Sequence, residues 1–382
     1  MTDNRYRRLP VGIQSFKVIR EENYLYVDKS DIVWNMVNLG DKYNYLSRPR
    51  RFGKSVLVDT LESYLEGRKD LFEGLKIMQM EKDWKHYPVI RLDMSRGGAS
   101  EDTLRSYLNL RFKDYEEKYN ITPDPTAMLA DRFHAIIATA YKQTGLRVAV
   151  LIDEYDSPLQ HSWRTPEHEK CTGVYREVFA ILKADDEYEH FVFITGITKF
   201  TQISLFSVLN NLSNISFTPE YAAICGITEE EIEENFMPEI CQMSEANNWS
   251  VQETHDRLKA YYDGYHFSRR NMVDVYNPYS LVNALKSKEI INFWASSGAT
   301  SLLPKFVDNA ELRMKSFENC RIMRNTLELS DVSGGGAELF LYQSGYLTIK
   351  DSDEFGYILG FPNEEVKQAL YEYYGEDLTA GR

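Results

Sequence analysis

The chain has few cysteines and no long apolar run, and these two shortages exclude several classes of protein. Its cysteines stand far apart along 382 residues, without CxxC or Cys/His metal spacing, so we expect neither a disulfide scaffold nor a zinc module. No segment reaches the roughly 18 consecutive apolar residues of a membrane span. The start, MTDNRYRRLPVG, lacks the apolar core of a secretory signal. We therefore expect a cytoplasmic protein with reduced thiols at Cys171, Cys225, Cys241 and Cys320.

Basic residues are also in short supply, with 44 Lys and Arg against 58 Asp and Glu and a net charge of −14. This balance argues against a protein that coats DNA over its whole surface. The charge is uneven, because residues 1–60 hold 11 basic and 7 acidic residues (+4), whereas residues 218–263 hold 2 and 11 (−9). The seven histidines lack HxH or HExxH spacing, which disfavours metals other than Mg²⁺. The length suffices for two or three domains.

Apolar strands alternate with helices in the first 200 residues. A helical spacing of apolar residues follows Ser55 and closes at Gly67, and a second helical stretch runs over 101–143 with a break near 122–126. Continuous apolar runs, typical of strands buried on both faces, occupy 146–156 and 190–198, and the shorter segments 43–47 and 87–95 are also predicted as strands. The pattern predicts an α/β fold with a parallel sheet covered by helices.

The pattern changes past residue 215. Helices are predicted over 227–236, which begins with the capping box Thr228/Glu231, and over 251–262. Near the end, residues 345–361 alternate around an Asp/Ser-rich turn and predict a hairpin that resembles the wing of a winged-helix domain. The predicted domains are a core over 1–216, a helical lid over 217–290, and a winged-helix-like region with the start of a linker over 291–382.

The stretch RPRRFGKS (48–55) ends like a phosphate-binding loop. Such a loop needs amides curled around phosphate oxygens, a lysine for the β and γ phosphates and a hydroxyl for Mg²⁺, and Gly53, Lys54 and Ser55 supply the last part. The full GxxxxGK[ST] pattern requires glycine where this chain has Arg48, and that exchange could distort the loop. By itself, the motif is compatible with a nucleotide site or with a chance GKS in a basic turn.

A second motif favours the nucleotide site. VAVLIDEYD (148–156) has the form of a Walker B strand, in which Asp153 would hold Mg²⁺ and Glu154 would orient or deprotonate the attacking water. A strand ending in solvated acids is the plainer alternative. FVFITGITKF (191–200) is an apolar strand that ends in threonines, and Thr198, or else Thr195, could sense the γ-phosphate. A threonine that only satisfies backbone groups at the strand end is an equal alternative.

Six motifs together resemble the bacterial AAA-ATPase-like family. They are RPRRFGKS, LIDEYD, TGITKF, YDGYHF (262–267), VYNPYSLVNAL (275–285) and YQSGYLTIK (342–350), and they extend over nearly the whole chain. The resemblance implies a P-loop NTPase core with a variant P-loop in which Arg48 belongs to the family pattern. It also implies that a C-terminal nuclease-like domain of the PD-(D/E)xK type often follows. Glu365-Val366-Lys367 fits half of such a nuclease site, but we interpret it as a helix start capped by Asn363.

The resemblance implies a Mg²⁺-dependent ATPase of the AAA type. Lys54, Glu154 and Thr198 are the predicted catalytic residues, and Ser55 with Asp153 is the predicted Mg²⁺ site. One alternative is a nucleotide-dependent switch with little turnover, whose winged-helix-like region engages DNA or a protein. Another is the ATPase part of a nucleic-acid-processing protein whose nuclease domain is outside this chain. Oligomerisation stays open. The predicted ATP-binding residues are Arg48, Pro49, Arg50, Arg51, Phe52, Gly53, Lys54, Ser55 and Val56.

Overall fold

The computed structural model describes most of the chain as two compact units. The described residues are 7–124, 126–200, 212–295, 302–307, 317–330, 332 and 335–378. None of the helices in these ranges is both long and apolar enough to cross a membrane. One unit, which we call the sheet unit, comprises Val33–Ser47 and Val58–Ile215. The other, the lid unit, comprises Met1–Ile32, Arg48–Leu57 and Ser216–Arg382. The predicted three-domain division stays a prediction.

The sheet unit is built on a five-stranded sheet in the order β2-β3-β4-β1-β5, in which every neighbouring pair is parallel. Its central strands carry long apolar side chains that are almost wholly buried, as expected where helices cover both faces. The strands are β1 (Tyr43–Ser47), β2 (Val89–Asp93), β3 (Val148–Asp153), β4 (Glu189–Gly196) and β5 (Ser213–Asn214). The predicted α/β fold with a parallel sheet is therefore confirmed.

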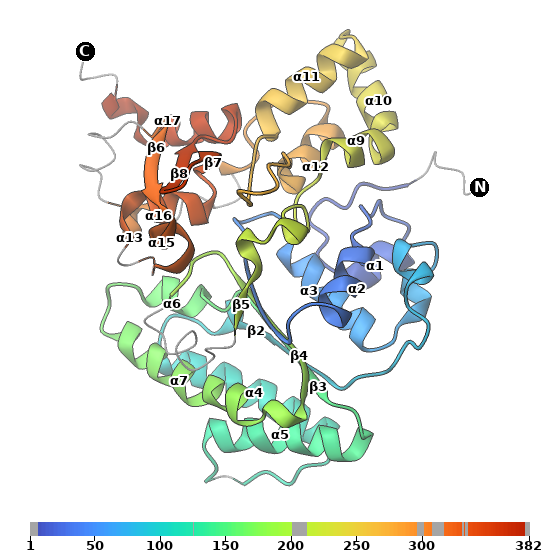
Figure 1. Ribbon diagram of the computed structural model, residues 1–382, viewed down its shortest axis with the longest axis vertical. Helices are drawn as coiled ribbons and strands as arrows, with labels where there is room; N and C mark the ends of the chain where they lie inside the picture. Colours follow the sequence, from blue (N-terminus) through green and yellow to red (C-terminus); the bar gives the residue numbers. More distant parts are fainter. Residues whose placement is uncertain are drawn as a thin grey trace. The chain divides into compact units, whose positions relative to one another are not determined.

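Helices cover the two faces of this sheet (Figure 1). Helices α4, α5 and α7 pack on one another and lie on one side, while α2 and α3 lie on the other. The break predicted near 122–126 separates α4 from α5. The helices that lie wholly or mostly in this unit are α2 (Ser30–Asn38), α3 (Lys54–Leu65), α4 (Glu101–Lys118), α5 (Leu129–Thr144), α6 (Ser157–Ser162) and α7 (Glu167–Ala184).

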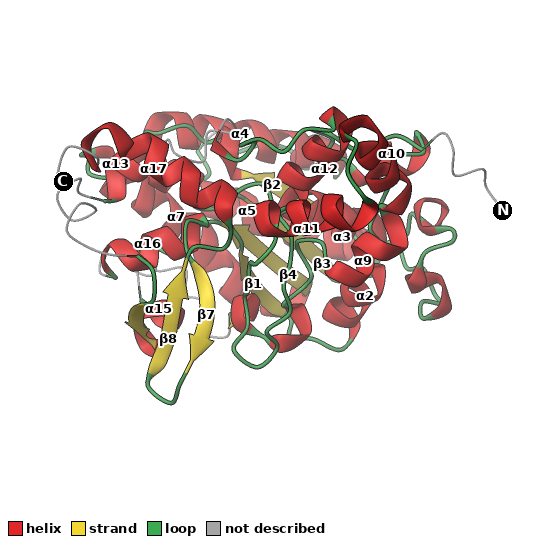
Figure 2. Cartoon of the chain, turned by 90° about the horizontal axis from the view of Figure 1, so that it is seen from above, coloured by secondary structure: helices red, strands yellow, loops and turns green. Residues whose placement is uncertain are grey.

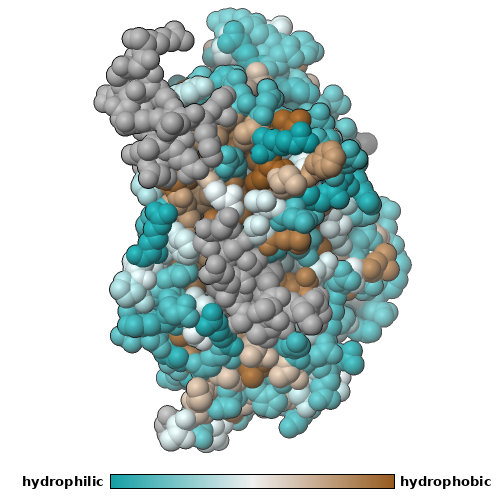
Figure 3. Space-filling model, turned by 60° about the vertical axis from the view of Figure 1, so that its left-hand side comes forward, coloured by the Kyte–Doolittle hydropathy of each residue, from teal (hydrophilic) through white to brown (hydrophobic). Residues whose placement is uncertain are grey.

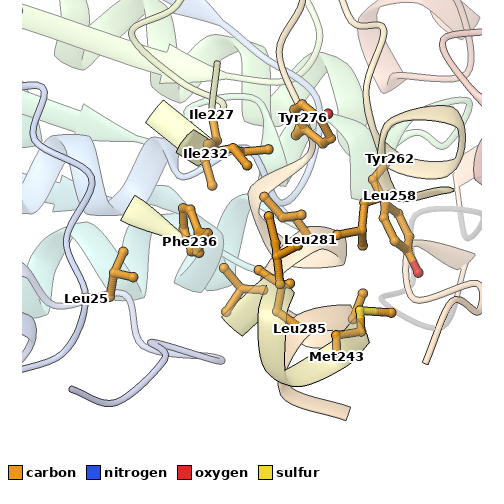
Figure 4. Close-up of a cluster of buried hydrophobic side chains, with 13 residues drawn as sticks. Leu25, Ile227, Ile232, Phe236, Met243, Leu258, Tyr262, Tyr276, Leu281 and Leu285 are labelled. Atoms are coloured by element: carbon orange, nitrogen blue, oxygen red, sulfur yellow. The ribbon is translucent and has the colours of Figure 1, made fainter. Parts of the chain in front are cut away.

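The lid unit contains a helical cluster with its own apolar core (Figure 4). The predicted capping box is present, since the Thr228 hydroxyl oxygen accepts from the Glu231 amide and the Glu231 carboxylate accepts from the Thr228 amide. Burying Phe236, Ile240 and Leu281 completely contributes about 1.5–3 kcal/mol per side chain. The helices are α1 (Phe16–Glu21), α9 (Glu229–Asn235), α10 (Met237–Asn247), α11 (Val251–Tyr262) and α12 (Pro278–Ser287).

The C-terminal part of the lid unit contains a three-stranded sheet in the order β6-β8-β7. The predicted hairpin is present as the antiparallel pair β7 and β8, and Figure 2 shows it extending away from α16 and α17. The strand β6, the helices α15 and α16 and the hairpin of β7 and β8 follow one another along the chain, which is the winged-helix-like arrangement expected from the sequence. The elements are α13 (Leu303–Phe306), β6 (Cys320–Met323), α15 (Arg324–Leu329), α16 (Gly336–Ser344), β7 (Thr348–Ser352), β8 (Gly356–Gly360) and α17 (Glu364–Leu378).

Candidate functional site

The loop of residues 48–53 joins the end of β1 to the start of α3. Arg51 and Gly53 have left-handed backbones, with φ of +69° and +87°. A Cβ added at Gly53 would meet no heavy atom within 4 Å, so glycine is needed there for the backbone conformation and not for space. Left-handed residues at alternate positions favour a concave run of amides. This run leads into a helix N-terminus, where backbone amides carry partial positive charge.

Lys54 lies across this loop. Its Nζ donates to the carbonyl oxygens of Arg48 and Pro49, at 2.9 Å in each case, and the residue is only 6% exposed. The next two residues, Ser55 and Val56, are half-buried in the first turn of α3. The ammonium is thus held over the same short loop that contains the left-handed Arg51 and Gly53.

Arg48 is buried and turned toward other segments of the lid unit. Its Nη1 donates to the carbonyl oxygen of Ser216 and its Nη2 to that of Tyr221, both at 2.9 Å. The guanidinium carbon lies 4.1 Å from the centre of the Phe267 ring. Burial lowers the pKa of Arg48 from its ordinary value; carbonyl dipoles and an aromatic face compensate a buried guanidinium.

The other side chains of the loop differ in exposure. Arg50 is half-buried, and Arg51 is exposed with its guanidinium 4.9 Å from the Tyr279 ring centre. Phe52 is 1% exposed, and its ring packs edge-on against Tyr265 and Phe267, at centroid distances of 4.7 and 5.4 Å. The loop is therefore anchored in the lid unit by both its first residue and its aromatic residue.

The end of β3 carries the predicted acidic pair in the sheet unit. Asp153 is 3% exposed, and its Oδ1 accepts from the Glu154 amide at 3.0 Å. Glu154 itself is half-buried and has a left-handed backbone with φ of +46°. This conformation is unfavourable for a residue with a long side chain and is concentrated at functional sites. The strained turn redirects the chain between the strand and α6.

Thr198 lies beside this acidic segment, in a buried hydrogen-bond network with Asp156. One oxygen, Oδ2 of Asp156, accepts from the amides of Ile197 (3.0 Å) and Thr198 (2.6 Å) and from the Thr198 hydroxyl (2.6 Å). Gln160 Nε2 donates to that oxygen at 2.5 Å and to the Thr198 hydroxyl at 2.9 Å. The Thr198 hydroxyl, which is 0% exposed, therefore donates one bond and accepts another.

Two nearby residues have roles that sequence reasoning missed. Asp156 follows Asp153 by three residues, and the acidic ending of DEYD was its only signal. Gly196 is required beside it, because an added Cβ would lie 2.4 Å from Asp156 Oδ1. Thr195, the second candidate sensor, is buried and donates to the Leu46 carbonyl at 2.8 Å, which links β4 to β1.

The sheet register places another carboxylate next to the acidic pair. Asp93, the last residue of β2, is the direct partner of Asp153 across the parallel pairing. Its side chain accepts from the amide and hydroxyl of Ser95, at 3.2 and 2.6 Å. The strand VIRLD ends in an acid in the same way as VAVLID, which is the signal that could have singled it out.

The nuclease-like ExK triplet lies at a helix start, as interpreted from the sequence. Asn363 Oδ1 accepts from the Val366 amide at 3.1 Å. Glu365 is 0% exposed, and its Oε1 accepts from the amides of Phe293 and Trp294. Burial raises the pKa of Glu365 to about 7. Lys367 pairs with Glu318 at 2.8 Å.

Comparison with known proteins identifies a family. The model of the family described as predicted AAA-ATPase matches residues 10–206. An uncharacterized protein in the vnfD 5′ region of Azotobacter chroococcum mcd 1 is 33% identical over 376 residues, which cover 96% of this chain and 69% of that protein. Both matches include the loop at 48–53 and the acidic pair at 153–154.

Two solved structures are similar over most of the chain, with TM-scores too low to define a shared fold. A Walker-type ATPase of Pyrococcus abyssi is 12% identical, with a TM-score of 0.45 and coverage of 92% of this chain and 97% of its own. Cdc6p of Pyrobaculum aerophilum is 11% identical, with a TM-score of 0.28 and coverage of 91% and 92%.

Proposed function

Because the chain belongs to the predicted AAA-ATPase family, we propose that it binds ATP with Mg²⁺ and hydrolyses the bond between the β and γ phosphates. The observation that carries the proposal is the loop of residues 48–53. It combines left-handed Arg51 and Gly53 with a lysine ammonium bonded across the loop, directly before a helix N-terminus. A concave run of amides with a nearby cation is suited to phosphate oxygens.

The residues proposed for the site supply the groups that phosphoryl transfer needs. Lys54 would bind the β and γ phosphates. The Ser55 hydroxyl and the Asp153 carboxylate are oxygen ligands of the kind that Mg²⁺ prefers, and the bound ion would neutralise charge on the phosphates. Glu154 would accept the proton of the attacking water. As the water oxygen bonds to the γ-phosphorus, the bond from that phosphorus to the bridging oxygen breaks, and ADP and phosphate leave.

Thr198 would contribute through the order of its segment. Its hydroxyl is shared between Asp156 and Gln160, which supports a role in fixing residues 196–200 beside the Walker B turn. The amide of Tyr155 also donates to the Thr195 carbonyl at 3.0 Å. We therefore propose that the acidic pair and the segment after β4 are positioned together.

The test is ATP binding and turnover, with Mg²⁺ present, in Lys54→Ala and Glu154→Gln. We expect Lys54→Ala to lose ATP binding, because the only side-chain cation proposed for the β and γ phosphates is gone. Glu154→Gln should keep its ATP affinity while kcat falls about 10²- to 10⁴-fold. Matched controls are Lys170→Ala and Glu253→Gln, which remove exposed ion-pair partners on α7 and α11. A wild-type protein that neither binds nor cleaves ATP would refute the proposal.

The packing of the loop also favours a second function, a nucleotide-dependent switch with little turnover. Arg48 and Phe52 contact residues 216–221 and 265–267 of the lid unit, so a ligand on the loop could alter their order. Tight ATP binding without steady-state hydrolysis would favour the switch over the enzyme. ATP-dependent oligomerisation can be followed in the same samples by light scattering.

For a partner of the winged-helix-like region, we propose a protein segment that presents an apolar side chain among basic residues. The turn after β7 carries Asp353 and Glu354 beside Phe355, which is 59% exposed, and Met323 on β6 is 58% exposed. With Arg321 these residues line a hollow of about 570 Å³. A negative, partly apolar turn repels phosphate backbones and complements a basic partner.

The contrasting prediction, DNA engagement in a nucleic-acid-processing protein, is tested by a DNA shift assay at several salt concentrations. Binding by this chain that weakens steeply with salt would support DNA as the partner, and it would contradict the proposal of a protein partner. The control is Arg321→Glu, which makes the lining of the same hollow more acidic and should weaken a DNA contact made there.

A further inference from the structure

Arg48 contacts two segments of the lid unit that lie far from it in sequence, residues 216–221 and 265–267. Its two terminal nitrogens each donate to a different carbonyl, of Ser216 and of Tyr221, at 2.9 Å. Its guanidinium carbon lies 4.1 Å from the ring centre of Phe267, over the ring. At 1% exposure it is among the largest fully buried side chains of the described chain. Two directed bonds and a stacking contact fix a guanidinium in one orientation.

The contacts of Arg48 continue through the motif YDGYHF. Phe52, four residues along the same loop, packs on Tyr265 and Phe267. His266 stands between these two residues in the sequence, and both of its backbone groups bond to Thr348 of β7. The His266 amide donates to the Thr348 hydroxyl oxygen at 2.7 Å, and the Thr348 hydroxyl donates to the His266 carbonyl at 3.0 Å.

A second contact joins the same loop to the end of α16. Gly345, which ends α16 with φ of +92°, approaches so closely that an added Cβ would lie 2.6 Å from Pro49 Cβ. Its carbonyl accepts from the Tyr265 hydroxyl at 3.2 Å. The loop, residues 265–267 and the segment 345–348 are therefore packed as one body within the lid unit.

We propose that Arg48 is a positioning residue, which bridges the phosphate loop to residues 216–221 and 265–267 and so makes the order of the loop and of these segments interdependent. This inference rests on the proposed function, since the loop is taken as the ATP site. It deepens that function because Arg48, which replaces the first glycine of the GxxxxGK[ST] pattern, would contact the lid unit and would not bind the phosphates.

The exchange of arginine for lysine separates the two possible roles. A role in which positive charge acts on phosphates is largely kept by Arg48→Lys. A role that depends on two carbonyl bonds and a flat face is lost, because an ammonium is compact and cannot reproduce the planar fork. Arg48→Met removes both charge and fork. Arg257→Met is the matched control, since Arg257 also lies over a ring, 4.4 Å from the centre of Trp249, and donates to Glu253.

The first measurement is the affinity for Mg²⁺-ATP by calorimetry. We expect Arg48→Met and Arg48→Lys to weaken it by similar factors of about tenfold or more, while Arg257→Met stays within about twofold. Wild-type affinity in Arg48→Lys together with a loss in Arg48→Met would overturn the proposal, because the charge alone would then suffice. A wild-type protein without ATP affinity refutes the proposed function and leaves the bridge itself to the second measurement.

The second measurement is hydrogen exchange in the nucleotide-free protein. The amides of His266 and Val275, which donate to Thr348 and to Tyr265, should exchange about tenfold faster or more in both Arg48 variants. Amides of α4 serve as the reference and should not change. Unchanged exchange at His266 and Val275 would overturn the bridge. If Arg48→Met does not fold, Phe267→Leu, which removes the ring that lies against Arg48 and Phe52 but keeps both carbonyl bonds of Arg48, should give the same two shifts with smaller size.

Discussion

Replacing Asp156 by asparagine is a sharp test of the hydrogen-bond network beside the end of β3. Asparagine has nearly the same shape, but its amide carries no charge, and its NH₂ group is a donor. In the wild type, Oδ2 of Asp156 accepts four hydrogen bonds, three of them from Ile197 and Thr198. The residue is 1% exposed, so water cannot replace what the substitution removes.

The size of the effect follows from those bonds. A hydrogen bond to a charged group contributes about 1.5–3 kcal/mol and a neutral one about 0.5–1.5 kcal/mol. Losing the charge that these four donors share therefore lowers the free energy of unfolding by about 2–4 kcal/mol, because neighbouring bonds are not fully additive. Thr198→Val, which leaves Gln160 without one acceptor, should cost about 1–3 kcal/mol. Thr198→Ser keeps the hydroxyl and should cost less than either.

The assay is urea-induced unfolding followed by far-UV circular dichroism. Asp114→Asn is the matched control, because Asp114 pairs with Arg111 at 2.7 Å on the exposed face of α4, and such pairs contribute about 0–1 kcal/mol. ATP turnover in the same variants adds a functional readout: Asp156→Asn should lower kcat with little change in ATP affinity. Equal unfolding free energies for Asp156→Asn and Asp114→Asn would refute the reasoning.

Two further predictions concern the sheet unit. Gly196→Ala should destabilise the protein by about 1–3 kcal/mol, because the added Cβ would lie 2.4 Å from Asp156 Oδ1. Gly173→Ala, in open space within α7, should instead stabilise it by about 0.5–1 kcal/mol. Urea unfolding that ranks the two variants in the opposite order contradicts this prediction. Burial raises the pKa of Glu189 from 4.5 to about 8, partly opposed by the Tyr43 hydroxyl that donates to it. The folded state then keeps a proton that the unfolded state releases, so wild-type stability falls between about pH 4.5 and 8. Glu189→Gln should remove that fall in unfolding measured at pH 5 and 8; parallel losses in both proteins would contradict it.

Most of the sheet could be predicted because its strands are mainly apolar segments between helical patterns. The segments at 43–47, 148–153 and 190–196 all form strands, because strands buried on both faces are rich in apolar residues. The strand β6 was missed for the opposite reason. Its four residues, Cys320–Met323, alternate in exposure, with one buried, and such a short mixed segment has no distinctive period.

The residues proposed for catalysis follow from local motifs, whereas the contacts that hold them do not. Two short motifs, RPRRFGKS and LIDEYD, contain Gly53, Lys54, Asp153 and Glu154. Each motif is recognised from residues that are close together in the sequence. The bond from Thr198 to Asp156 joins residues 42 positions apart, and that from Arg48 to Tyr221 joins residues 173 apart. No single sequence encodes such pairs as a period or a spacing, because they depend on how strands and loops pack. The hydrogen-bond partner of Thr198 was therefore not predictable.

The backbone of the loop explains why arginine is tolerated at position 48. A first glycine is needed where the chain turns through a left-handed conformation or approaches a neighbour too closely for a Cβ. Among the described residues of this loop, the positive φ values belong to Arg51 and Gly53. The left-handed backbone conformation that favours glycine therefore occurs later in the loop, next to Lys54. Position 48 can therefore hold a residue with a long side chain. The buried guanidinium of Arg48 finds the partners that it requires in the carbonyls of Ser216 and Tyr221 and in the Phe267 ring.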